Sequence, residues 1–118
     1  MFLSCLKNPS SDNDFLIKVD SINIPLTISS GTPFDIEFFG TIGFDQCNGF
    51  KTFNQIHENN NITIEAWGTY DNNGGACPPD LIYMSGQKLN LTIPIPGEYT
   101  IKIREPNDYL LVKQIIVK

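Results

Sequence analysis

Few side chains in this 118-residue chain have the type and spacing that enzyme chemistry requires. The chain has a single histidine, His57, with no nucleophile beside it, and such a histidine is more often a surface residue than a catalyst. There is no G-x-S-x-G nucleophile elbow, and the Ser-Ser-Gly at 29–31 has no base at a readable spacing. We therefore expect no catalytic residue and no cofactor. A hydrolase is a weaker hypothesis than a binding module or a small inhibitor.

Metal-binding patterns are equally weak. The Asp/Asn-rich patches at 11–14 and 71–75 do not have the spacing of an EF-hand loop, and these residue types are common in turns. The three cysteines form no CxxC pair that would indicate zinc. A net charge of −5, without clustered Lys or Arg, argues against nucleic acid as a partner. We expect neither a metal site nor nucleic-acid binding.

The composition favours strands over helices. Ile, Phe, Thr and Tyr are abundant and Ala is scarce, while 8 prolines and 9 glycines separate short apolar runs. No window shows sustained helical spacing of apolar residues, and no apolar run approaches the roughly 18 residues of a membrane-spanning helix. The chain is predicted to be all-β.

Alternating apolar residues and turn signals predict about seven strands, at 15–24, 34–43, 49–58, 61–70, 81–93, 99–103 and 109–117. The segment 81–93 is either one interrupted strand or two short ones. The clearest is 34–43, in which Phe34, Ile36, Phe38 and Ile42 share one face. The two prolines and the Ser-Ser-Gly of 25–33 indicate that any strand there lies at a sheet edge or is broken. For Ile56 to face the core together with Ile62 and Ile64, the hairpin loop between their strands needs three or five residues. The pattern predicts a single two-sheet Greek-key sandwich over 14–118, with a barrel as the alternative, and a flexible tether over 1–13.

The turn "PGEYTIKI" at 96–103 resembles one found in immunoglobulin-like β-sandwich modules of bacterial secreted and lipid-anchored proteins. Gly97 permits the turn, and Tyr99 can return its hydroxyl to the preceding loop as in a tyrosine corner. The stretches "SINIPLTISSGTPFDIEFFGTIGFDQC" and "ITIEAWGTY…GGAC" are similar to small modules of this kind that carry a cysteine in each of those two loops. The resemblance covers about 15–118 and implies a fold rather than an activity.

Cys47 lies in the loop after the predicted strand 34–43 and Cys77 in the loop after the hairpin, and both loops emerge at one end of the sandwich if the two strands between them run up and back. A disulfide between them would close a loop of about 30 residues and contribute roughly 3–4 kcal/mol in the chain-entropy treatment. It would also indicate an oxidising compartment. Two unrelated free thiols are the alternative.

Cys5 then remains as the odd cysteine. "FLSC" followed by a polar run resembles the end of a bacterial lipoprotein signal peptide, which implies lipid attachment at Cys5 and anchoring by two or three acyl chains. The charged and most of the apolar regions of such a signal are not in the sequence. Met1 would then be an internal methionine of a longer precursor, or the chain was cut there. Alternatively, Cys5 is an exposed thiol on a frayed terminus.

Three aromatic residues fall on the polar phase of their predicted strands. Phe39, Phe53 and Trp67 would form an outward binding patch if their strands were neighbours. Against this, the inside/outside phase could be wrong for one strand, or a neighbouring segment could cover the rings.

Together these features predict a non-enzymatic, lipid-anchored module in the bacterial periplasm or on the outer surface, or otherwise secreted. We expect a monomer that binds or scaffolds a protein or glycan and touches the membrane only through its lipid. The alternative is a small protease inhibitor that presents the loop 71–80, made rigid by the disulfide and by Pro78 and Pro79.

Overall fold

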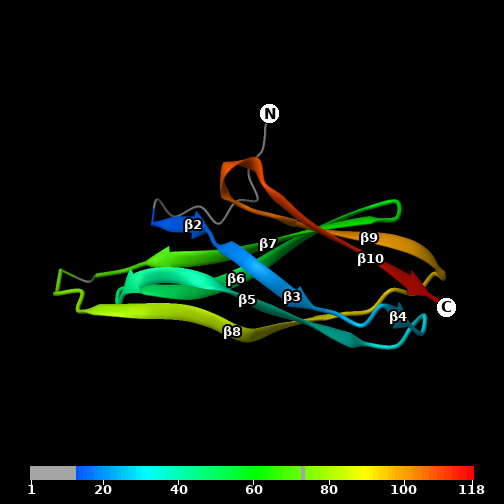
Figure 1. Ribbon diagram of the computed structural model, residues 1–118, viewed down its shortest axis with the longest axis horizontal. Coiled ribbons are helices and arrows are strands. Elements are labelled where there is room, and N and C mark those ends of the chain that lie inside the picture. The colour runs from blue at the N-terminus through cyan, green and yellow to red at the C-terminus, as the bar shows by residue number, and fades with distance from the viewer. Residues whose placement is uncertain (1–12, 73) are drawn as a thin grey trace.

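The computed structural model describes residues 13–72 and 74–118 and is predominantly β-strand (Figure 1). Its strands are β2 (Asp14–Leu16), β3 (Lys18–Asn23), β4 (Thr27–Ile28), β5 (Phe34–Asp45), β6 (Asn48–Glu58), β7 (Asn61–Tyr70), β8 (Pro79–Leu91), β9 (Gly97–Arg104) and β10 (Leu110–Val117). One short 3-10 turn, η1 (Pro106–Asp108), joins β9 to β10. Within these residues no helix is long and apolar enough to span a bilayer. The predicted tether at 1–13 falls almost wholly outside the described residues.

The strands form two sheets rather than a closed barrel. The six-stranded sheet has the order β2-β7-β9-β10-β4, with β6 on the other edge of β7, and it is mixed because β7 pairs β9 and β10 pairs β4 in parallel. The three-stranded sheet β3-β5-β8 is antiparallel. The prediction of an all-β, two-sheet architecture is confirmed at this level.

The described residues form more strands than the seven predicted, because short segments cross between the sheets. The predicted strand 15–24 divides at Ile17: β2 pairs β7 in the large sheet, whereas β3 pairs β5 in the small one. Ile17 is 1% exposed at this crossing, so the chain changes sheets through the core. The prolines of 25–33 leave only the two-residue β4, which lies at a sheet edge as predicted.

The core lies between the two sheets and is formed by every second side chain of the facing strands. The residues predicted to face inward on β5 are 9% exposed or less, and Tyr99, Ile101 and Ile103 on β9 are 7% exposed or less. Both sheets contribute one face to a single buried cluster. The alternation read from 34–42 and 99–103 therefore predicts the buried faces of these strands correctly.

The predicted tyrosine corner is also present. The Tyr99 hydroxyl donates a hydrogen bond of 2.8 Å to the carbonyl of Ile95 in the preceding loop. Gly97 has a φ of +154°, which a residue with a side chain adopts at a cost. The glycine lets the chain turn, and the tyrosine ties the turn to the strand that follows.

The β6–β7 hairpin differs from the prediction in its register. Glu58 pairs with Asn61, so the turn has two residues, Asn59 and Asn60, and Asn59 has a φ of +56°. Ile56 therefore pairs with Thr63, faces away from the core and is 38% exposed. The expectation of a three- or five-residue loop is wrong. The two-residue turn shifts the pairing by one residue from the predicted register, and such a shift moves every side chain of a strand to the other face.

Candidate functional site

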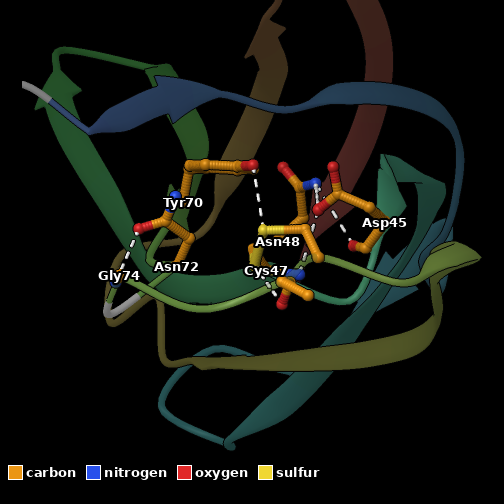
Figure 2. The surroundings of a disulfide bond; sticks show 8 residues. Asp45, Cys47, Asn48, Tyr70, Asn72 and Gly74 are labelled. Atoms are coloured by element: carbon orange, nitrogen blue, oxygen red, sulfur yellow. Dashed lines mark hydrogen bonds between the residues drawn. A yellow bond between two sulfur atoms is a disulfide. The ribbon is translucent and has the colours of Figure 1, made fainter.

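The two loop cysteines meet at the end of the molecule where β5 and β7 end and β8 begins (Figures 1 and 2). Cys47 lies in the two-residue turn between β5 and β6, and Cys77 lies shortly before β8. They form a disulfide with a Cα–Cα distance of 5.3 Å. The predicted Cys47–Cys77 pair is confirmed.

Hydrogen bonds hold the turn that carries Cys47. One carboxylate oxygen of Asp45 accepts bonds of 3.0 Å from the Cys47 backbone N–H and from the Asn48 side-chain amide. An aspartate that caps its own turn in this way fixes the backbone of the next two residues. The sulfur of Cys47 is thus presented from a constrained position.

The loop after β7 is fastened to this turn at both of its ends. The Asp71 N–H donates to the Cys47 carbonyl, and the Gln46 N–H donates to the Pro78 carbonyl, each at 2.9 Å. The Tyr70 hydroxyl lies over the disulfide and donates to the Cys77 sulfur at 3.1 Å (Figure 2). The β5–β6 turn and the residues flanking the loop therefore form one cross-linked unit.

A carboxylate and the two sulfurs lie within 4.8 Å of one another at this unit, from Asp45, Cys47 and Cys77. A metal would require the cysteines as thiolates, and in this structure their sulfurs are bonded to each other. The chemistry of the three residues here is that of a structural cross-link.

Beside the cross-linked end lie three exposed apolar side chains, Phe44, Leu81 and Tyr83, which we call the end cluster. They are 75%, 58% and 44% exposed. Leu81 and Tyr83 share the outer face of β8, since Ile82 between them packs against the core. Between the pairs Gly43–Ile82 and Asp45–Pro79, Phe44 lies opposite Asp80 and Leu81 of the adjacent strand. The sequence pattern missed this cluster, because register irregularities around Gly43 shift the phase of β5.

The predicted aromatic patch is not formed. Phe53 points inward, where its ring centroid lies 4.6 Å from that of Phe38. Phe39 belongs to the three-stranded sheet and Trp67 to the six-stranded sheet, so their outer faces lie on opposite sides of the sandwich. The prediction is wrong because the phase of β6 was reversed: Phe53 pairs with the buried Ala66.

Trp67 instead belongs to a polar cluster on the outer face of the six-stranded sheet, centred on Glu65. One oxygen of the Glu65 carboxylate accepts hydrogen bonds from the Trp67 indole N–H at 3.0 Å and from the Asn54 amide at 3.3 Å. The other oxygen accepts one from Nε of Arg104 at 2.6 Å. Burial alone would raise the pKa of Glu65, but the bonds from Arg104, Trp67 and Asn54 outweigh it and hold the pKa below its ordinary value.

This cluster makes stability depend on pH. Because the folded-state pKa of Glu65 is below the unfolded value of 4.5, its contribution is present at pH above about 4.5 and is lost as pH falls through the folded-state pKa. We expect Glu65→Gln to lower the free energy of unfolding by about 1–3 kcal/mol at pH 7 and by much less at pH 3. Urea denaturation of both proteins at the two pH values measures this. An equal loss at both would contradict the charged state assigned to Glu65.

The remaining predicted positions are placed as follows. Cys5 lies outside the described residues. His57 is exposed on β6, and its Nε2 lies 2.7 Å from the side-chain oxygen of Gln55. Residue 73, within the loop 71–80, also lies outside the described residues.

Comparison with known proteins gives no match to this chain, whether among protein-family models, curated proteins or solved structures.

Proposed function

We propose that this chain is a non-enzymatic module of the bacterial cell envelope that binds or scaffolds a protein partner. The observation that carries the proposal is the end cluster, three exposed apolar side chains held next to a cross-linked turn. Contiguous exposed apolar side chains rimmed by polar residues are typical of protein-binding surfaces. A rigid support lowers the conformational entropy lost on binding.

The location of the module is inferred from its cysteines. The Cys47–Cys77 disulfide is compatible with an oxidising compartment such as the periplasm or the cell exterior. Lipid attachment at Cys5, inferred from "FLSC" and the polar residues after it, would keep the module at a membrane surface. Protein expressed from its full upstream reading frame should then carry acyl chains on Cys5 in an intact-mass measurement. A free Cys5 thiol would overturn the anchor.

The finer architecture proposed is an immunoglobulin-like Greek-key sandwich. Two packed sheets and a tyrosine corner at the start of β9 support it. The parallel pairing of β7 with β9 departs from the antiparallel sheets of that architecture. The fold is therefore better evidence that the chain presents a binding surface on a rigid scaffold than that it belongs to a particular family.

A charge placed in the end cluster tests the binding function. Immobilised wild-type protein and the variants Phe44→Asp and Ile56→Asp would be compared for proteins retained from an envelope extract of the source organism. Ile56 is the matched control, because it is exposed and apolar but lies on the outer face of the other sheet. We expect Phe44→Asp alone to lose the retained partner. Retention of the same proteins by all three would contradict a role for the end cluster.

Protease inhibition through the loop 71–80 is the second candidate. The backbone bonds that fasten Asp71 and Pro78 to the β5–β6 turn favour it, because a loop fixed at both ends is preorganised for a protease cleft. A panel of proteases assayed at micromolar protein tests it. If no enzyme is slowed, the loop is not inhibitory.

A further inference from the structure

The cluster around Glu65 occupies the outer face of the six-stranded sheet, away from the end cluster. Its members come from three neighbouring strands: Asn54 from β6, Glu65 and Trp67 from β7, and Arg104 from β9. Asn54 pairs directly with Glu65 across β6 and β7. The parallel pair Ile64–Ile103 places Arg104 beside Glu65 from the other side.

The Glu65 carboxylate fixes the orientation of the side chains around it. The bond to the indole N–H holds the half-buried ring of Trp67 in one position on the sheet. The bond to Nε uses one donor of the Arg104 guanidinium, which has five, and 45% of that side chain is exposed. Among the described residues no further hydrogen bond engages its two terminal nitrogens. An aromatic surface and a guanidinium fork are thus presented side by side.

A second cation lies on the same face. Lys102 precedes Arg104 by two residues on β9, so both side chains project from the same side of the strand, and Lys102 pairs with Thr63 of β7. The nearest acids on this face are already paired: Glu65 with Arg104, and Asp14, which pairs with Thr69 of β7, with Lys51. Glu58 and Glu98 lie about 13 Å or more along their strands from Glu65 and Arg104, from a rise of about 3.3 Å per residue. Lys102 therefore gives this face a net positive charge although the chain as a whole carries −5, and the face is complementary to an anion.

We propose that this face, formed by Asn54, Trp67, Lys102 and Arg104, binds a carboxylated glycan. The C–H face of a sugar ring packs on an indole, which offers a large, rigid contact area. A guanidinium fork pairs with a planar carboxylate through two parallel hydrogen bonds, and an ammonium group adds charge without fixed geometry. The amide of Asn54 supplies donor and acceptor groups for hydroxyls. The site is separate from the end cluster and does not depend on a protein partner there.

The single tryptophan of the chain is Trp67, so its fluorescence reports directly on this face. The probe is an oligogalacturonate, and its methyl-esterified form is the neutral match with the same sugar backbone. We expect the charged form to change the emission saturably, with an affinity that falls as salt rises, and the ester to bind far more weakly. Equal affinity for the two forms, or no saturable change at millimolar probe, would overturn the proposal.

Variants then locate the contact. Lys102→Gln should weaken binding of the oligogalacturonate roughly fivefold, the worth of one exposed charge contact of up to about 1 kcal/mol. Lys113→Gln is the matched control, because Lys113 pairs with Ile101 and so projects from the opposite face of the sheet. Its affinity should stay within about twofold of wild type. Equal losses in both variants would show binding by net charge alone, and equally tight binding of polyglutamate would show an acidic peptide site. Either result would refute the glycan assignment.

Discussion

Removal of the Cys47–Cys77 disulfide should lower the free energy of unfolding by about 3.6 kcal/mol. The bond joins residues 30 positions apart, and the chain-entropy treatment gives this value for a loop of that length at 25 °C. The native end should change little, since Asp45 caps the β5–β6 turn and backbone bonds join Asp71 and Pro78 to it without the sulfurs. The loss is therefore expected to arise mainly from the freer unfolded chain.

Urea denaturation of the double variant Cys47→Ala/Cys77→Ala measures this effect, with Cys5→Ala as the matched control. The double variant leaves no new free thiol to form mixed disulfides. Its urea dependence should steepen, because an uncrosslinked chain exposes more surface when it unfolds. A loss below about 1 kcal/mol would contradict the prediction and show that the unfolded chain keeps this loop closed without the bond.

The local alternation of apolar and polar residues was sufficient to predict the buried faces of the central strands. The alternation through Phe34, Ile36 and Phe38 identifies the buried face of β5, because a strand with one face in a core must repeat every two residues. The same rule holds for Tyr99 and Ile101 on β9. The disulfide could also be predicted, since two cysteine-bearing loops lie at the same end of the sandwich once the strands between them run up and back.

The errors occurred where the phase depends on tertiary pairing. Two asparagines can form a two-residue turn or part of a longer loop, and the choice reverses the facing of Phe53 and Ile56. A register irregularity near Gly43 brings Phe44 to the surface at 75% exposure, although its strand begins with a regular alternation. Irregularities of this kind are set by the partner strand, and one sequence alone does not encode them locally.

The cluster around Glu65 could not be predicted for a different reason. Its members are spread from position 54 to position 104, and the parallel pairing of β7 with β9 that joins Arg104 to Glu65 has no local signature. The one available signal was Glu65 in a strand of apolar neighbours, where a carboxylate requires partners. That signal indicates the need for donors but does not identify them.

The change of Phe38 to Ala should produce the other large loss, about 3–5 kcal/mol in the free energy of unfolding. Phe38 is 0% exposed, and its ring lies against Phe53, which in turn contacts Phe50 at a centroid distance of 4.9 Å.

The surrounding side chains belong to strands of both sheets, so they cannot close around the missing ring without moving the sheets relative to each other. Phe39→Ala is the control: it removes the same ring from the next residue of β5, on the outer face, and should cost about 1 kcal/mol or less. Urea denaturation of the two variants decides between the faces. Equal losses of unfolding free energy in the two variants would contradict the inward position of Phe38. They would also contradict the packing of Phe53 against Phe38, which turns Phe53 away from the surface and separates it from Phe39 and Trp67.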